Sequence, residues 1–480
     1  MHAPALKCAR VSLNHLVRAV NMTLFRSLRR QSWFMAEIVP FRAYRYNLER
    51  VKLADVVTQP YDKITPAMQE RYAMLSPYNL IAVEKGKPSP KDSPADNVYT
   101  RAEKALETWI RDGVMVRDSR PGIYVYFQEY TMPERAERRT RKGFIAVGRL
   151  EDYAAGVIFR HELTHTGPKA DRLELLRRTR THTGQLFMLY SDPQRRIDSL
   201  IDEIVARCHP GEAPVEAKDE YGVVHRIWPV FGPEIIADIG RAIASQKLVI
   251  ADGHHRYETA LAYRDECRAK SAGDDRNAPY EKAMMTFFNT HGEGLLILPT
   301  HRLVANLPSF DIGSFRRKIS SVFDQEDYAF GSDAARTATG ERFQRDLLAS
   351  GETGRALGMY AGGAFTLLRL RRDADLQKLM PNLSAAQRKL DVVLLHRVLL
   401  EEGLGITPAA ITAEQNISYE REIGAALDAV DRNRAQICFL LNPVGINQVM
   451  EIALSGEVLP QKSTDFYPKL LSGLTLYRLD

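Results

Sequence analysis

The segment from Leu248 to Arg264 reads LVIADGHHRYETALAYR and passes from a strand into a helix with almost no connection between them. Mostly apolar residues end at Asp-Gly, and a helical pattern starts with the next residue. Glycine permits the sharp turn that this junction requires, because it has no Cβ atom. The corner therefore predicts a fold that combines a sheet with helices.

Strands and helices alternate irregularly along the rest of the chain, and several strand pairs have the pattern of hairpins. GIYVYFQEYTM and RKGFIAVGRL form one such pair, and no internal repeat is present. From about Pro308 the sequence changes to helices with polar faces. These features predict a mixed α/β (α+β) fold with additional hairpins and a mostly helical C-terminal part.

The length of 480 residues is long for one domain and comfortable for two. We expect a catalytic or binding domain over residues 36–307. A C-terminal α/β domain over residues 308–480 is expected to pack on it.

Residues 1–35 form a basic leader with six lysines and arginines and no acid. Without the leader the chain has 60 basic and 60 acidic residues, so the overall charge of +6 comes from this segment. Its mixed sequence lacks the compact apolar stretch and cleavage site of a secretory signal. It is either a disordered basic arm for nucleic acid or membrane, or a start assigned too early. We favour the early start, because Met35 opens the ordered-looking MAEIVPFRAYRYN.

Neither the apolar runs nor the cysteines suggest a membrane or an oxidising compartment. The longest apolar runs fall far short of the roughly 18 residues that indicate a membrane span. The four cysteines are far apart and form no CxxC pair, which argues against a disulfide framework and against a cysteine zinc site. We expect a cytoplasmic protein.

The corner has the residues of an anion cradle. The first turn of a helix has backbone N–H groups without partners and a partial positive charge, and a phosphate satisfies both. Arg256 can grip phosphate oxygens through two N–H groups. Asp252 can bind Mg²⁺ or accept a proton, and the histidines can donate hydrogen bonds. The alternative is that Asp252 only caps the helix and the histidines belong to a polar rim.

The sequence ADGHHRYETAL resembles the signature of the ParB/sulfiredoxin-like superfamily, and it is most similar to the DGHHR stretch of free serine kinases. The wider chain resembles a bacterial family of unassigned function, domain of unknown function ten-fifteen, often labelled SpoOJ/ParA/ParB/RepB. The resemblance runs from PFRAYRYN through QPYDKITPAMQERY and GPKADRLELLRRTR to LPQKSTDFYPKLLSGL. It implies a ParB/sulfiredoxin-like nucleotide-binding core, with ATP or ADP and Mg²⁺ as ligands. The corner residues that carry over are Asp252, Gly253, His254, His255 and Arg256.

Other charged groups fall at the ends of predicted elements. Lys169 and Arg172, in TGPKADR, form a candidate second anion site or a surface turn. His301 ends the apolar strand in GLLILPTHRLV, and Lys462 lies in the loop PQKSTDFYPK, where both could contact phosphate. His396 lies within an apolar helix and is expected in the core.

The motif HELTH, residues 161–165, matches the H-E-x-x-H pattern of zinc proteases. That chemistry requires both histidines on one helical face. A strand-like GVIF precedes the motif and Gly-Pro follows it, so we expect no helix and no metal site here. Glu162 remains a candidate general base in a loop.

The pattern favours a nucleotide-dependent phosphotransferase acting on a small molecule, similar to free serine kinases. His255 and Arg256 would hold the phosphates, Asp252 or Glu162 would polarise the acceptor hydroxyl, and Lys169 and Arg172 would neutralise charge. His254 is a further catalytic candidate. One alternative is a nucleotide-switched, ParB-like DNA-binding protein, which the zero net charge of the chain after residue 35 disfavours. The other is a phosphatase of a small metabolite.

Overall fold

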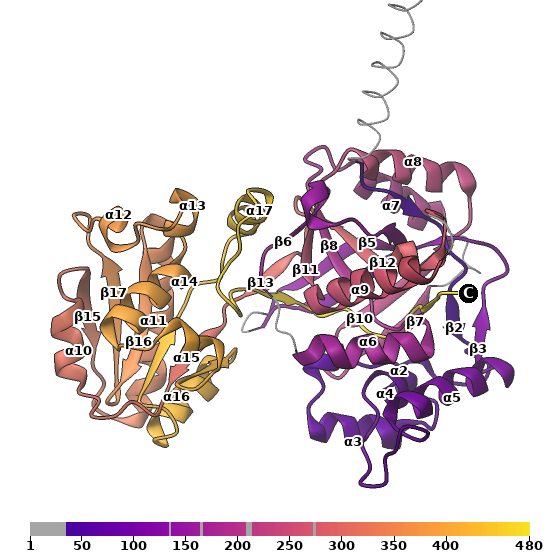
Figure 1. Cartoon of the computed structure of the whole chain (residues 1–480). Helices are drawn as coiled ribbons and strands as arrows, with labels where there is room; N and C mark the ends of the chain where they lie inside the picture. The colour runs from indigo at the N-terminus through magenta and orange to yellow at the C-terminus, as the bar shows by residue number, and fades with distance from the viewer. Residues whose placement is uncertain (1–34, 134–135, 164–166, 208–213, 272–274) are drawn as a thin grey trace, which may run out of the picture.

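The computed structural model describes residues 35–480 except 134–135, 164–166, 208–213 and 272–274. The leader thus lies almost entirely outside the described residues. Two separate sheets divide these residues into two bodies (Figure 1). In the described part of the chain, no helix has both the length and the apolar character needed to span a membrane.

A nine-stranded, mostly antiparallel sheet forms the first body, with the order β6-β11-β8-β12-β5-β4-β10-β9 and β1 paired to β5. Only the pairs β6–β11 and β8–β12 are parallel. Its strands are β1 (Ile38–Val39), β4 (Ile123–Thr131), β5 (Arg138–Arg149), β6 (Ile158–Arg160), β8 (Leu186–Tyr190), β9 (Val215–Lys218), β10 (Val224–Val230), β11 (Leu248–Asp252) and β12 (Lys282–Asn289). The predicted hairpin is β4–β5, with Tyr124 opposite Ile145.

Helices cover both faces of this sheet, because alternate residues of its central strands are apolar on each side. Ile123 and Val125 of β4 pack toward α7 (Arg196–Arg207), α8 (Pro233–Ala244) and α9 (His254–Lys270). Tyr124 and Tyr126 face the opposite core with α5 (Val98–Arg111) and α6 (Gly167–Thr179). The remaining elements here are β2 (Tyr44–Tyr46), β3 (Met115–Arg117), α2 (Leu53–Val56), η1 (Tyr61–Lys63), α3 (Pro66–Leu75), α4 (Ile81–Glu84), η2 (Tyr153–Ala155), β7 (Thr181–His182) and η3 (Pro279–Glu281).

The second body is a six-stranded antiparallel sheet with the order β15-β17-β16-β19-β14-β18 and helices packed against it. Its strands are β14 (His301–Val304), β15 (Phe323–Tyr328), β16 (Ala356–Ala361), β17 (Ala364–Leu370), β18 (Ile417–Glu420) and β19 (Ile437–Leu440). Its helices are α10 (Ile312–Ile319), α11 (Asp333–Thr353), α12 (Leu376–Leu379), α13 (Ala385–Arg388), α14 (Asp391–Leu394), the π-helix η4 (Leu395–Gly403), α15 (Pro408–Thr412) and α16 (Ile423–Asp431). Helix α17 (Ile446–Leu454) lies between the two bodies and contacts α13 as well as β6 and β11 of the first sheet (Figure 1).

After α17 the chain returns to the first body (Figure 1). Within residues 459–471, which we call the strap, β20 (Asp465–Tyr467) pairs with β13 (Leu296–Leu298). Beyond the strap, β21 (Tyr477–Arg478) pairs with β7. Phe41, near the start of the described residues, and Leu476, near their end, belong to one hydrophobic cluster.

The mixed α/β prediction is confirmed, whereas the ParB/sulfiredoxin-like core remains a prediction. The expectation that GLLILPTHRLV forms one strand is wrong. Its two halves are β13 and β14, which lie in different sheets. The last strand of the nine-stranded sheet is β12 and the first strand of the six-stranded sheet is β14, and five strands of the second sheet follow residue 307. The domain division at residue 307 stays a prediction.

Candidate functional site

The corner places the first turn of α9 at the end of β11. Gly253 adopts a left-handed conformation with φ of 91°, which a glycine tolerates without strain. It is also the N-cap residue of α9, and no side chain caps the first-turn amides. The Asp252 carboxylate instead accepts a hydrogen bond of 3.0 Å from the Gly253 amide. Asp252 is therefore not a helix cap, and the amide donors of α9 are left for another acceptor.

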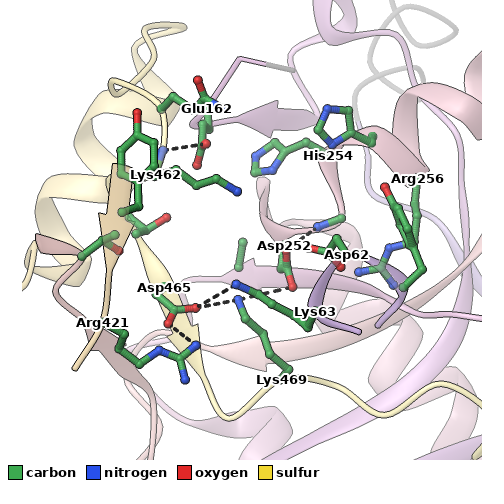
Figure 2. A pocket seen from close by; sticks show the side chains of 18 of the residues that line it. Asp62, Lys63, Glu162, Asp252, His254, Arg256, Arg421, Lys462, Asp465 and Lys469 are labelled. Atoms are coloured by element: carbon green, nitrogen blue, oxygen red, sulfur yellow. Dashed lines mark hydrogen bonds and ion pairs between the residues drawn. The ribbon is translucent and has the colours of Figure 1, made fainter. Parts of the chain in front are cut away.

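This turn opens into a cavity of about 990 Å³, which is lined by both bodies and the strap (Figure 2). A volume at the upper end of the range for small-molecule sites has room for more than one small ligand. The first body contributes the corner together with η1, Lys85 and Glu162. The second body contributes β18 and the residues that follow it, and the strap contributes Gln461, Lys462, Thr464, Asp465 and Lys469.

A chain of alternating charges crosses the floor of the cavity (Figure 2). The Lys469 ammonium lies 3.5 Å from the Asp252 carboxylate and 3.0 Å from that of Asp465. Asp465 also pairs with Lys63 at 3.8 Å and with Arg421 at 2.5 Å. The five side chains come from β11, the strap, η1 and the end of β18, so tertiary folding alone brings them together.

These ion pairs fix the protonation states of Asp252 and Lys469. Burial alone would raise the pKa of Asp252, but Lys469, Arg256 and Lys63 lower it well below the ordinary value. Burial opposes the charge of Lys469 as well, yet Asp252 and Asp465 raise its pKa to about 12. Asp252 is therefore a carboxylate, and Lys469 an ammonium, at every physiological pH.

Glu162 lies across the cavity from this floor. Its carboxylate accepts a hydrogen bond of 2.9 Å from the backbone amide of Lys462. Burial raises the pKa of Glu162, although the Lys462 amide and its ammonium oppose the shift. A carboxylate with a raised pKa that faces a cavity can accept a proton during catalysis.

His161 and His254 form a pair behind the corner, with ring centroids 4.8 Å apart. The Nδ1–H of His161 donates to the carbonyl of Ile250 at 2.7 Å, so its Nε2 accepts from the Thr464 hydroxyl at 2.8 Å. Burial lowers the pKa of His161 to about 4 and that of His254 well below its ordinary value. Both rings are thus neutral at pH 7, and His161 links β11 to the strap.

The structure does not support the zinc-protease pattern in HELTH. Residues 161–163 are not helical, and Glu162 forms a bridge with Leu459. His165 lies outside the described residues. Among the residues that the structure describes, no group of three or more His, Cys, Asp or Glu side chains could hold a metal ion.

Seven of the ten predicted site residues line this cavity: Glu162, Asp252, Gly253, His254, His255, Arg256 and Lys462. The other three do not. Lys169 pairs with Glu258 at 3.1 Å, and Arg172 donates to the Glu84 carbonyl and covers the Tyr61 ring. His301 is buried and accepts a hydrogen bond from the Leu441 amide.

The cavity is also lined by four residues that the sequence did not predict: Lys63, Lys85, Arg421 and Asp465. The only local signal for Lys63 is an Asp-Lys pair between Pro60 and Pro66 in QPYDKITP. Such a pair is typical of any surface turn. The assignment of these residues therefore depends on the tertiary structure.

Comparisons with solved structures find distant similarities. A free serine kinase in complex with AMP shares 12% identity, with 66% of this chain and 89% of that chain covered and a TM-score of 0.31. A conserved hypothetical protein from Pyrococcus furiosus shares 12% identity, with 67% and 92% covered and a TM-score of 0.31. SbnI from Staphylococcus aureus, C-terminally truncated, shares 8% identity, with 68% and 85% covered and a TM-score of 0.32.

No curated protein matches the chain. The family model described as "Protein of unknown function (DUF1015)" matches residues 38–393, which is most of the sequence. This match confirms the resemblance to the family of unassigned function, whereas the ParB and SpoOJ labels remain predictions. The chain belongs to the DUF1015 family.

Proposed function

We propose that this protein is a nucleotide-dependent phosphotransferase that acts on a small molecule. The observation that carries the proposal is the uncapped first turn of α9, which opens into a large cavity lined by charged side chains of both signs. Amide donors and a helix dipole favour a phosphate at this position. The basic residues that line this cavity are Lys63, Lys85, Arg256, Arg421, Lys462 and Lys469, and the acidic ones are Asp62, Glu162, Asp252, Glu414, Glu420, Glu422 and Asp465.

Arg256 is held in a position to grip such a phosphate. One of its nitrogens donates to the Gln185 carbonyl, and its guanidinium packs directly over Gly253. A Cβ atom at residue 253 would lie 3.1 Å from Nε of Arg256, so only glycine leaves this space free. The guanidinium and the amides of α9 would thus bind one anion together.

Glu162 is the proposed general base. It would take the proton of the acceptor hydroxyl while the acceptor oxygen bonds to the terminal phosphorus. The bond between that phosphorus and the bridging oxygen breaks, and the nucleoside diphosphate leaves. The fixed cations would stabilise the charge on the leaving oxygens, so the rate enhancement would come from positioning and electrostatics.

The resemblance implies Mg²⁺ beside the nucleotide. Mg²⁺ in phosphate sites is usually held by one or two carboxylates together with phosphate oxygens and water. Asp62 and Asp252 both line the cavity and fit that small donor set. Bound there, Mg²⁺ would neutralise charge on the transferred group.

Calorimetry on residues 35–480 tests the proposal with ATP, ADP, CTP, pyrophosphate, serine and phosphoserine, each with and without Mg²⁺. We expect Arg256→Ala to weaken nucleotide binding by about tenfold or more, since a charge-assisted hydrogen bond contributes roughly 1.5–3 kcal/mol. Arg177→Ala is the matched control, because Arg177 lies on the surface and pairs with Glu266 and Glu174.

Absence of binding by every phosphate compound would refute the proposal. Nucleotide binding that Arg256→Ala leaves unchanged would place the phosphates elsewhere. Release of inorganic phosphate from phosphoserine, without transfer to an acceptor, would identify a phosphatase. DNA binding that weakens steeply with salt would instead favour the ParB-like alternative.

A further inference from the structure

Two arginines, one from each sheet, hold the strap by its backbone. Arg141 on β5 and Arg302 on β14 are each only 1% exposed. Among the described residues, no carboxylate forms an ion pair with either guanidinium. A buried charge without a counter-ion is costly, so the contacts that retain it call for an explanation.

Arg302 holds the first half of the strap. Its Nη2 donates to the carbonyls of Gln461 and Lys462, at 3.2 and 3.0 Å. Its Nη1 donates to the carbonyl of Thr300, and the Tyr419 ring lies 5.2 Å from the centre of the guanidinium. The amide of Lys462 in turn donates to Glu162. Arg302 therefore fixes the peptide that orients the proposed base.

Arg141 holds the second half of the strap in the same way. Its nitrogens donate to the carbonyls of Tyr467 and Pro468. The guanidinium lies over the adjacent rings of Phe187 and Phe288, 4.6 and 4.7 Å from their centroids. Gln128 accepts from Arg141 and donates to the carbonyl of Lys469 at 2.8 Å. The backbone that carries Lys469 is thus fixed on both sides.

Neither arginine contacts the cavity, so neither is a candidate to bind substrate directly. Burial lowers the pKa of each to about 10, which still leaves both charged at neutral pH. A guanidinium presents several donors in a fixed plane, and it can therefore hold two carbonyls at once.

We propose that Arg141 and Arg302 are positioning residues, which clamp the strap so that Lys469 meets Asp252 and the Lys462 amide meets Glu162. The part of this proposal that concerns ligand binding and catalysis rests on the proposed function. The clamp itself is testable without any ligand.

Hydrogen–deuterium exchange on residues 35–480 measures the clamp directly. We expect Arg302→Met to raise exchange in peptides covering 459–464 by about tenfold or more, and Arg141→Met to do so in 465–471, because each loses its carbonyl contacts. Arg264→Met is the matched control: Arg264 is a buried arginine of the first body that pairs with Asp152 and Asp265 and does not contact the strap. Unchanged exchange of the strap in both variants would overturn the proposal.

The pH dependence of pyrophosphate binding separates positioning from general destabilisation. The groups that act on Asp252 are Lys469, Arg256, Lys63 and His254. If Arg141→Met displaces Lys469, Asp252 takes up a proton at a higher pH than in the wild type. The ratio of variant to wild-type Kd should then fall from about pH 7 to about pH 4.5, because a protonated Asp252 repels the anion less. A ratio that is constant with pH would contradict the positioning role of Arg141.

Arg141→Lys and Arg302→Lys keep the charge but lose the planar fork, and they replace the methionine variants if those fail to fold. We expect them to raise strap exchange in the same segments, by a smaller factor. Absence of pyrophosphate binding by the wild type, together with raised exchange in the variants, would refute the proposed function and leave the clamp intact. Normal binding with unchanged exchange would refute the clamp alone.

Discussion

Lys469 is the residue that joins the Asp252 and Asp465 carboxylates of the site. It neutralises Asp252 and Asp465 together, and its own side chain is only 10% exposed. Removing one member of a buried ion pair leaves the other charge without compensation, which costs more than the pair contributes. Asp465 keeps Arg421 and Lys63 as partners, whereas the ion pair of Asp252 depends on Lys469.

We expect Lys469→Met to lower the free energy of unfolding by about 3–5 kcal/mol, since the Asp252 carboxylate loses its ion pair while Asp465 keeps Arg421 and Lys63. Chemical denaturation at pH 7 measures the change. The double variant Lys469→Met/Asp252→Asn should recover part of the loss, because it removes the carboxylate that has lost its ion pair. A double variant no more stable than the single one would show that the ion pairs are not the cause.

The lowered pKa of His161 predicts that the free energy of unfolding depends on pH. Burial holds its folded-state pKa at about 4, whereas an unfolded histidine titrates near 6.5. Below that ordinary value the unfolded state binds the extra proton, so stability falls as the pH decreases from about 6.5 to about 4. The full contribution, on the order of 3 kcal/mol, is present above the ordinary value.

His161→Gln should therefore reduce the slope of unfolding free energy against pH in this window, even if it lowers stability at pH 7. Urea titrations at about pH 7, 6, 5 and 4.5 measure the slope. His291→Gln is the control, because His291 lies in an exposed turn and contacts Ser191. An unchanged slope in His161→Gln would contradict the assignment of a depressed pKa.

Among the elements, the β11–α9 corner is the one that sequence reasoning could reach. Its strand, its glycine and its helix are adjacent, so local pattern determines them. β20 and β13 are a contrasting case, because Phe466 pairs with Ile297 across a long stretch of chain. Nothing in either segment identifies its partner, and Lys469 and Asp465 reach the site only through that pairing. Sequence reasoning also missed the strand break at Pro299, although a proline inside an apolar run is a known sign of one.

We expect Gly253→Ala to destabilise the corner by about 1–2 kcal/mol, because an L-residue is strained at positive φ. Its Cβ would also press on Arg256, so pyrophosphate binding should weaken. Gly240→Ala in α8 is the matched control: nothing lies within 4 Å of its Cβ, and alanine in a helix is favoured over glycine by about 1 kcal/mol. The two substitutions should shift the melting temperature in opposite directions, and a shared direction would contradict the strained corner.

For the whole molecule, one hydrophobic cluster extends through both bodies. It includes Phe187 of the first sheet, Phe439 of the second and Phe466 of the strap. Such continuity favours cooperative unfolding, because neither body can lose its packing alone without exposing the shared surface.

We expect a single unfolding transition in calorimetry, and we expect Phe466→Ala to lower the unfolding free energy by about 3–5 kcal/mol. Phe466 is fully buried and packs against Phe187 with ring centroids 5.4 Å apart. Phe330→Ala, in a partly buried position of the separate cluster on the other face of the second sheet, should cost less. Two well-separated transitions in the wild type would show that the bodies fold independently.

The return of the strap to the first body also has a consequence during synthesis. A ribosome makes the corner at residues 252–256 more than 200 residues before it makes Lys469. The first sheet can begin to form while the chain is still growing, but Asp252 then has no Lys469 and β13 has an unpaired edge. An open edge of this kind is a template for incorrect pairing. A nascent chain should therefore be unable to bind its ligand, and most vulnerable to aggregation, until the segment that closes the site has left the ribosome.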